Sequence, residues 1–271
     1  MSIIKAVLFD MDGVLASVGS SYREAIIKTA ARFGIIVTQE DIAVEKKKGN
    51  ANNDWVLSKK LIDARLDDVS KSPTLEKVTE VFEELYQGTA TTKGLCESES
   101  LIPSKGLLVE VHKRCEGRVA VVTGRPRKDC EKFLSVHGLK ELFPICICME
   151  DAPAKPDPKP VLLACERLGL HPSVCIMIGD TPDDIRAAVS AGAIPYGVLT
   201  PEEDAKLTLG LIGLAQSMST SMVECGAVLI MRAGLGEFLD VAFSSGRSSL
   251  LRQGTVSRAT KETSISASVV C

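Results

Sequence analysis

A short apolar run that ends in two closely spaced aspartates constrains the fold of this chain more than any other feature. Residues 3–9 are apolar except for Lys5, and Asp10, Asp12 and Gly13 follow them. A run of this length predicts a buried strand. Side chains two apart on a strand point the same way, so both aspartates are expected to face one site, and the glycine allows a sharp turn after them. The alternative is a strand capped by a solvated turn.

After about residue 95 the sequence alternates between helical and strand patterns, which is typical of a parallel sheet. We therefore expect an α/β fold with a doubly wound parallel sheet and a ligand site at the carboxyl ends of its strands. Further strands are expected at residues 118–122, 145–149, 174–178, 194–199 and 227–230. Helices are expected at about residues 104–115, 126–138, 158–168, 182–191, 202–222 and 235–242.

The region between the first strand and this alternating part, about residues 18–92, shows helical patterns only. Ser21, Thr38 and Asn53 are candidate N-caps for three helices. Apolar residues at helical spacing predict a fourth helix, which ends before Gly88.

These patterns predict three parts of the chain. A discontinuous core domain takes residues 1–15 and 95–243, and an all-helical domain is inserted at residues 16–94. From residue 244 onward the chain is rich in Ser, Thr and Arg and has no apolar period. Residues 244–271 are therefore predicted to be a disordered tail.

Composition and charge argue against several classes of protein. The formal net charge is -3, from 32 basic and 35 acidic residues, which gives no support for nucleic-acid binding. No apolar run reaches membrane-spanning length, and a strand that begins at Ile3 leaves no room for a signal peptide. Nine scattered cysteines, several of them in apolar strands, favour a reducing compartment, so we expect a cytoplasmic protein.

Polar residues also follow the strand expected at residues 118–122. Thr123 and Gly124 lie at its end, with Arg125 next. A hydroxyl beside a glycine that frees backbone N–H groups suits a phosphate oxygen. The alternative is an ordinary strand-ending turn.

A lysine follows the strand expected at residues 145–149. Lys155 begins a Lys-Pro-Asp-Pro stretch. Its compact charge can offset a phosphate and crowded carboxylates, and the prolines pre-organise the loop. Taken alone, a solvated loop lysine is the commoner interpretation.

Two acids follow the strand expected at residues 174–178. Asp180 lies at the strand end and Asp184 on the first turn of the next helix. Acids at this spacing can converge on one cation, and hard oxygen ligands suit Mg²⁺. Helix capping by Asp180 is the alternative, but it does not account for Asp184.

Together and in this order, the four segments resemble the motifs of the haloacid dehalogenase-like (HAD) superfamily. The chain matches Asp-x-Asp-x-[Thr/Val]-[Leu/Val] at residues 10–15, the strand-ending Thr at 123, Lys-Pro-x-Pro at 155–158 and Gly-Asp-x-x-x-Asp at 179–184. The helical insertion resembles the cap of HAD subfamily I, a group that includes phosphoglycolate phosphatase-like and beta-phosphoglucomutase-like enzymes. The resemblance covers residues 3–243 and implies a Rossmann-like core with a helical cap.

The resemblance implies a catalytic role for four residues. Asp10 would be the nucleophile. Asp12 would protonate the leaving oxygen and then activate water. Thr123 and Lys155 would position the phosphoryl group.

The resemblance also implies the ligands of a cation and of the phosphate. Mg²⁺ would be held by the side chain of Asp10, the backbone carbonyl of Asp12, and the side chains of Asp180 and Asp184. The phosphate-binding residues would be Thr123, Gly124 and Arg125.

Asp12 discriminates between the reactions of this superfamily, because dehalogenases and phosphonatases lack an acid at its position. We therefore expect a phosphatase that hydrolyses a small phosphorylated metabolite through an aspartyl-phosphate. A phosphomutase of the beta-phosphoglucomutase type shares all four motifs and remains an alternative. A non-catalytic interaction protein is another, but such a protein should have lost these motifs, and this chain keeps them. A monomer or homodimer without nucleic-acid or membrane partners is expected.

Substrate identity is expected to depend on the cap, where residues 46–55 form an unusually polar loop. Lys48 and Asn50 in this loop, and more weakly Arg23, are candidate substrate-binding residues, because lysines attract anions and asparagines bind hydroxyls and amides. The alternative is a solvated loop. A similar Gly-Asn-Ala-Asn-Asn-Asp stretch marks a small HAD group that occurs fused to histidine-biosynthesis enzymes, which suggests histidinol phosphate as an alternative substrate.

Overall fold

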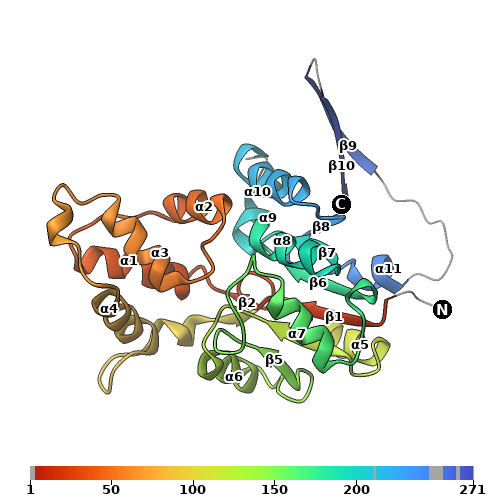
Figure 1. The fold of residues 1–271 in the computed structure, drawn as a ribbon, viewed down its shortest axis with the longest axis horizontal. Coiled ribbons are helices and arrows are strands. Elements are labelled where there is room, and N and C mark those ends of the chain that lie inside the picture. Colours follow the sequence, from red (N-terminus) through yellow and green to blue (C-terminus); the bar gives the residue numbers. More distant parts are fainter. Residues whose placement is uncertain (1–3, 210–211, 244–252, 261–262, 271) are drawn as a thin grey trace. The chain divides into compact units, whose positions relative to one another are not determined.

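The computed structural model forms two compact units, and most of their elements are labelled in Figure 1. We call the first the core unit; it takes residues 1–15 and 102–271. We call the second the cap unit; it takes residues 16–101. The described residues are 4–209, 212–243, 253–260 and 263–270.

A parallel sheet forms the centre of the core unit, which confirms the expected α/β fold. In spatial order its parallel strands are β5 (Ile145–Ile147), β4 (Val119–Val122), β1 (Ala6–Phe9), β6 (Cys175–Gly179), β7 (Ile194–Val198) and β8 (Leu229–Met231). Val7 of β1 lies opposite Val119 on one side and Ile176 on the other. The chain passes from β1 to β4 and β5 and then crosses to β6, so the strand order reverses beside β1.

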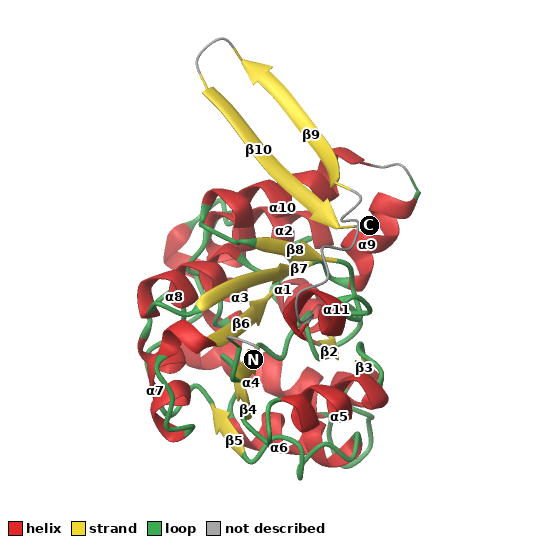
Figure 2. Ribbon diagram, turned by 90° about the vertical axis from the view of Figure 1, so that its right-hand side faces the viewer, coloured by secondary structure: helices red, strands yellow, loops and turns green. Residues whose placement is uncertain are grey.

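Helices cover both faces of this sheet; Figure 2 shows α7 and α8 on one face and α5 and α11 on the other. The helices of the core unit are α5 (Lys105–Arg114), α6 (Arg127–Val136), α7 (Lys159–Arg167), α8 (Pro182–Ala191), α9 (Pro201–Thr208), α10 (Ile212–Glu224) and α11 (Phe238–Phe243). A sheet covered on both faces explains the continuous apolar run of β1, whose four side chains are all buried. None of the helices in the described ranges is long and apolar enough to span a lipid bilayer.

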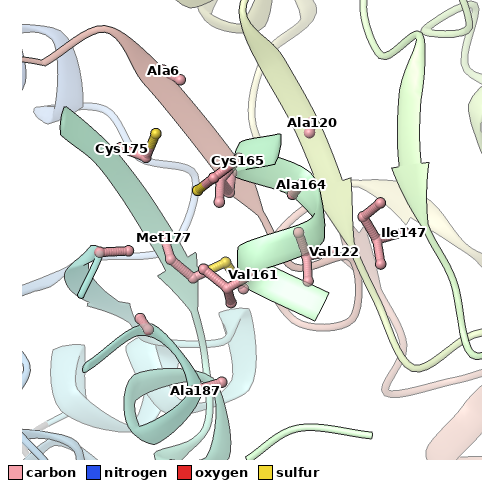
Figure 3. Packing of buried hydrophobic residues seen from close by; sticks show 13 residues of the cluster. Ala6, Ala120, Val122, Ile147, Val161, Ala164, Cys165, Cys175, Met177 and Ala187 are labelled. Atoms are coloured by element: carbon pink, nitrogen blue, oxygen red, sulfur yellow. The ribbon is translucent and has the colours of Figure 1, made fainter. Parts of the chain in front are cut away.

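The layer between the sheet and α7 fixes the strands that carry the polar motifs. Figure 3 shows Val161, Ala164 and Cys165 of α7 among the side chains packed with Cys175 and Met177 of β6. Close packing of this kind leaves little room for a strand to shift. The ends of the strands are therefore held in a fixed arrangement.

The cap unit is helical, as the sequence predicts. Its elements are α1 (Tyr22–Arg32), α2 (Gln39–Lys48), α3 (Asp54–Asp63) and α4 (Leu75–Gln87), with a short ladder of β2 (Ala16–Ser17) and β3 (Ser100–Leu101). Thr38 and Asn53 cap α2 and α3 as expected, because their side-chain oxygens accept N–H groups of the first helical turn. Local capping chemistry therefore sets where these helices begin.

Two local expectations are corrected by the structure. Ser21 precedes α1 but does not cap it, because its hydroxyl donates to Glu99 Oε1 at 2.8 Å instead. The single helix expected at residues 202–222 is divided into α9 and α10. Residues 210–211, between the two helices, lie outside the described residues.

The boundary of the cap unit lies later than the sequence predicts. The unit extends to Leu101, whereas residue 94 is its expected end. The reason is the ladder between β2 and β3, in which Ala16 pairs with Leu101 and Ser17 with Ser100. This pairing holds together the segment by which the chain enters the cap unit and the segment by which it leaves that unit.

The end of the chain differs from the disordered tail that the sequence predicts. It contains β9 (Gln253–Thr260) and β10 (Thr263–Val270), which pair antiparallel, and β10 pairs with β8. Two features account for this: the segment is rich in β-branched residues, and β8 would otherwise be an unpaired edge. Residues 244–252, 261–262 and 271 of the expected tail lie outside the described residues.

Candidate active site

The polar residues singled out in the sequence lie at the carboxyl ends of neighbouring strands. Asp10 follows β1, Thr123 follows β4 and Asp180 follows β6, and β1 lies between the other two strands. Lys155 lies on the connection from β5 to α7. In open α/β sheets, ligands bind at the carboxyl ends where the strand order reverses, and these residues occupy that position.

A buried lysine joins two of the carboxylates. The Lys155 ammonium lies 2.7 Å from Asp10 Oδ1 and 2.5 Å from Asp184 Oδ1, and it donates to the Val122 carbonyl oxygen at 3.0 Å. Each of the three charged residues is at most 5% exposed. Buried charges persist only when they are paired, so these side chains form one electrostatic unit.

The charges of this unit shift the pKa values of its members. Burial raises the pKa of Asp10 to about 7; Lys155 opposes the rise, while the charges of Asp184 and Asp12 add to it. Burial disfavours the charged form of Lys155, but Asp10 and Asp184 outweigh this and raise the pKa of the ammonium. Lys155 therefore stays charged, and the ionised form of Asp10 is disfavoured by burial and by the neighbouring acids more than Lys155 favours it.

Three carboxylates are placed where they can share a cation. Asp10, Asp180 and Asp184 each offer an oxygen, and these atoms lie within 4.8 Å of one another. Asp184 Oδ1 is buried and has no well-angled hydrogen bond, although the Lys155 ammonium is 2.5 Å away, so it keeps capacity to bind a cation. A set of carboxylate oxygens without His or Cys fits a hard ion such as Mg²⁺.

Two glycines and a threonine hold the acids of this cluster in place. A Cβ on Gly13, which has a φ of 78°, would lie 2.3 Å from Asp180 Oδ2, and one on Gly179 would lie 2.1 Å from the Cβ of Asp184. Thr181 donates its N–H (3.0 Å) and its hydroxyl (2.5 Å) to Asp184 Oδ2. Thr181, rather than Asp180, is therefore the cap of α8, and the Thr-x-x-Asp spacing is the sequence signal that identifies it.

Asp12 is anchored by an arginine. Arg125 Nε and Nη2 each lie 2.6 Å from Asp12 Oδ1. The arginine is buried, with its guanidinium carbon 5.5 Å from the centre of the Phe133 ring, and the backbone N–H of Arg125 donates to Thr123 Oγ1 at 3.1 Å. The sequence predicts that Arg125 binds substrate, whereas the structure places its guanidinium on Asp12.

The candidate residues of the cap unit are more accessible to solvent. Lys48 is exposed in the last turn of α2 and pairs with Glu45. Asn50 is exposed in a left-handed conformation, with a φ of 57°, and Arg23 is half-buried in the first turn of α1. Lys48 is the last residue of α2 and Asn50 follows it by two residues, so both lie where this helix ends.

The loop expected at residues 46–55 is shorter in the structure, because residues 46–48 belong to α2 and residues 54–55 to α3. Other polar residues of this stretch have structural roles. Lys46 pairs with Asp54 at 3.2 Å, which joins the end of α2 to the start of α3, and Asn53 caps α3. Trp55 donates its indole N–H to Glu83 Oε1 of α4 at 3.2 Å. These contacts leave Lys48 and Asn50 as the loop's better candidates for binding a substrate.

A family model matches most of the chain. Residues 4–192 match the model described as haloacid dehalogenase-like hydrolase. The matched span includes the four strand-end segments and the helical insertion.

Individual proteins show the same likeness. The chain is 50% identical over 275 residues to a protein named imidazoleglycerol-phosphate dehydratase from Phytophthora nicotianae; the match covers 98% of this chain but only 60% of that protein. It is 28% identical to the N-acetylmuramic acid 6-phosphate phosphatase of Pseudomonas aeruginosa, over 74% of this chain and 86% of that one. A Thermotoga maritima structure, provisionally named a beta-phosphoglucomutase, has a similar fold, with a TM-score of 0.58 at 24% identity over 88% of this chain and 98% of that one.

Proposed function

Because this chain belongs to the haloacid dehalogenase-like hydrolase family, we propose that it is a Mg²⁺-dependent phosphatase of a small phosphorylated metabolite. The observation that carries the proposal is the buried unit of Asp10, Lys155 and Asp184, with Asp180 beside it. The phosphatase relative, which matches 74% of the chain, supports a phosphoric monoester hydrolase. The unit combines acidic side chains with the Lys155 ammonium, which supplies the positive charge that a phosphate site requires.

Asp10 is the proposed nucleophile. Its carboxylate oxygen bonds to phosphorus while the bond from phosphorus to the leaving oxygen breaks, which gives an aspartyl-phosphate. Lys155 orients this carboxylate through Oδ1 and offsets the charge of the incoming phosphate. Positioning and charge offset dominate phosphoryl transfer, so this buried pair would account for much of the rate.

Asp12 is the proposed acid and base. Both contacts from Arg125 fall on Asp12 Oδ1, so Oδ2 is the oxygen that exchanges a proton. Asp12 gives a proton to the leaving oxygen in the first step and takes one from the water that attacks the aspartyl-phosphate in the second. Arg125 fixes the direction of the carboxylate for both steps.

The remaining residues would bind the cation and the phosphoryl oxygens. The side chains of Asp10, Asp180 and Asp184 would hold Mg²⁺, and the family resemblance adds the Asp12 backbone carbonyl. When bound, the ion would offset the repulsion between phosphate and carboxylates. Thr123 and Gly124, at the end of β4, would hold the phosphoryl oxygens.

One comparison favours a particular substrate class. The relative with 50% identity is named for imidazoleglycerol phosphate, a phosphate ester that carries an imidazole. That name describes a whole protein of which this chain spans 60%, so the dehydratase reaction need not belong to the shared part. A phosphate ester of an imidazole-bearing alcohol, such as histidinol phosphate, is therefore the second candidate beside a phosphorylated acid or sugar.

A panel of phosphate monoesters tests the proposal. The full chain with Mg²⁺ is incubated with histidinol phosphate, phosphoglycolate, N-acetylmuramic acid 6-phosphate and glucose 1-phosphate, and inorganic phosphate is measured. Release that saturates with one ester supports a phosphatase and identifies the class. Conversion of glucose 1-phosphate to glucose 6-phosphate without phosphate release would show a mutase instead. No reaction with any ester would contradict both.

We expect turnover to require Mg²⁺ and Ca²⁺ to inhibit it. Ca²⁺ prefers longer bonds and more ligands, so it would hold Asp10 in a poor geometry for attack. Mg²⁺ should also raise the melting temperature, because it binds the crowded carboxylates only in the folded chain. Phosphate release and thermal melts, each with and without chelator, measure the two effects. Full activity in excess chelator and an unchanged melting temperature would rule out the cation site.

We expect the stretch of residues 46–55, which includes the end of α2 and the loop after it, to determine substrate preference. Lys48→Ala should lower kcat/KM for the natural ester by about thirty- to a hundredfold, which corresponds to a lost charged contact of about 2–3 kcal/mol. Asn50→Gly should also lower kcat/KM for the natural ester. The change leaves the backbone unstrained, because glycine adopts the positive φ of this position. Hydrolysis of 4-nitrophenyl phosphate should stay close to the parent rate.

The matched control for this loop is Lys71→Ala. Lys71 is an exposed lysine of the cap unit that pairs with Asp68 and lies outside the loop. If Lys48→Ala and Lys71→Ala behave alike on the natural ester, the loop is merely solvated. Arg23 would then be the next residue to change.

A further inference from the structure

The segment that leads from β5 to Lys155 is bonded to the segment that follows β4. The Thr123 N–H donates to the Ile147 carbonyl oxygen at 2.9 Å, and the Met149 N–H donates to that of Arg125 at 3.0 Å. The two segments leave neighbouring parallel strands, and the first of them carries Lys155 while the second carries Thr123. The position of Lys155 therefore depends on how firmly these two segments are held together.

Asp151 lies in the segment before Lys155 and accepts hydrogen bonds from three residues. Its Oδ2 accepts the Cys148 N–H at 2.8 Å and contacts the guanidinium of Arg127, the first residue of α6. Its Oδ1 accepts a hydrogen bond from Arg167, the last residue of α7, at 3.3 Å. The Asp151 side chain is 15% exposed. One carboxylate thus connects the end of β5 to two helices.

The carboxylate of Asp151 is ionised at neutral pH. Burial raises its pKa, but the Cys148 N–H, Arg167 and Arg127 outweigh burial, so the pKa lies below the ordinary value for an aspartate. A hydrogen bond between two charged groups is stronger than one between neutral groups. The contact of Asp151 with Arg127 is of this stronger kind.

The two arginines on Asp151 hold different parts of the core unit. Arg127 follows Arg125 by two residues, and its backbone N–H donates to both carboxylate oxygens of Glu150, at 2.9 and 3.1 Å. The Arg127–Asp151 pair therefore adds a side-chain link between the segments that carry Thr123 and Lys155. Arg167 instead lies at the end of α7 that is remote from Lys155, because α7 begins at residue 159.

The short stretch between Asp151 and Lys155 provides little support of its own. Pro153 and Ala154 are exposed, whereas Lys155 is buried with its ammonium 2.7 Å from Asp10 Oδ1. We propose that Asp151 is a positioning residue for phosphoryl transfer, which acts by holding Lys155 against Asp10. The proposal rests on the phosphatase function proposed above. A reacting group that is displaced by about 1 Å can lower a rate by about 10²-fold.

The first measurement is kcat for 4-nitrophenyl phosphate. Asp151→Ala should lower kcat by about 10- to 100-fold in a chain that circular dichroism shows to be folded, because Lys155 then no longer orients the nucleophile. The same loss is expected with the natural ester. Asp151→Asn should stay close to the parent, because its amide oxygen can accept the same N–H groups.

The second measurement needs no substrate. The folded chain is treated with acetic anhydride, and acetylated lysines are mapped by mass spectrometry. Lys155 is 3% exposed and should be acetylated at least about tenfold faster in Asp151→Ala than in the parent, because local opening exposes its amine. Lys46, which pairs with Asp54 in the cap unit, is the internal reference and should react at the parent rate.

Arg127→Met and Arg167→Met form a matched pair of variants. Their guanidinium-bearing side chains are similarly exposed, at 38% and 41%, so loss of a surface ion pair alone would affect the two variants equally. We expect Arg127→Met to resemble Asp151→Ala in both measurements and Arg167→Met to resemble the parent. This pair also tests the proposal if Asp151→Ala does not fold.

Three outcomes would overturn the proposal. They are an unchanged kcat in folded Asp151→Ala, acetylation that is unchanged at Lys155 or raised equally at Lys46, and equal behaviour of the two arginine variants. If the parent hydrolyses no ester, the proposed phosphatase function fails, and acetylation still decides whether Asp151 positions Lys155.

Discussion

Asp10→Asn is expected to abolish phosphate release while leaving the chain at least as stable as the parent. An amide oxygen is a far weaker nucleophile than a carboxylate, so we expect a loss of at least about 10⁴-fold in kcat. Stability should not fall, because burial, together with the charges of Asp184 and Asp12, disfavours the charged form of Asp10 more than Lys155 favours it, and an amide carries no charge. Such a result would identify Asp10 as a position where function costs stability.

Phosphate release and a thermal melt without metal measure the two effects of Asp10→Asn. The matched control is Asp157→Asn, the same change two residues after Lys155. Asp157 Oδ1 accepts the N–H of Lys159 at 2.8 Å, and an asparagine oxygen can accept the same bond. The control should be fully active. Multiple turnovers by Asp10→Asn, or inactivity of both variants, would contradict the assignment of the nucleophile.

Lys155→Met is expected to impair both activity and folding. The methionine fills a similar volume but leaves Asp10 and Asp184 buried without their ammonium. Breaking a buried pair in this way costs about 3–5 kcal/mol of unfolding free energy at neutral pH. Loss of the phosphate's cationic partner should lower kcat/KM by roughly 10²- to 10³-fold.

The pH dependence of this variant follows from the direction of one pKa shift. The pKa of Asp10, already raised to about 7 in the parent, should rise further once Lys155 no longer opposes it. A carboxyl whose folded pKa exceeds its unfolded pKa stabilises the fold at low pH and loses that contribution as pH rises through the folded value. The deficit of Lys155→Met should therefore be smaller at pH 5 than at pH 8.

Denaturant unfolding of Lys155→Met at those two pH values, beside the control Lys159→Met, measures the effect. Lys159 is exposed on the first turn of α7, so its replacement should change stability by no more than about 0.5 kcal/mol. A deficit in Lys155→Met that is small, or equal at both pH values, would show that the ammonium does not balance the two carboxylates.

Much of the architecture can be predicted from the sequence, because it depends on local residue patterns. The apolar run before Asp10 predicts the central strand, and the structure confirms it because a strand buried on both faces needs apolar side chains throughout. Thr38 and Asn53 mark helix starts because their partners lie within three residues. The family resemblance rests on four short segments, three of which directly follow a strand of the sheet, while Lys155 lies on the connection from β5 to α7.

Other predictions depended on partners that the sequence does not display. Ser21 has the spacing of a capping residue, yet its hydroxyl binds Glu99, which the ladder at the base of the cap unit brings close. The segment after residue 244 has no apolar period, yet β10 pairs beside β8 because a sheet edge offers backbone hydrogen bonds to any extended chain. Both partners are distant in the sequence, so local composition does not predict either contact.

The sequence by itself determined which residues end the strands, because strand and helix periods are local properties of the chain. Only the tertiary structure decided how those residues pair. The contacts of Asp12 with Arg125 and of Asp10 with Lys155 join residues 113 and 145 positions apart. Their closeness depends on the order of the strands, which places β1 between β4 and β6. Strand order is set by packing of the whole sheet, so no single segment encodes it.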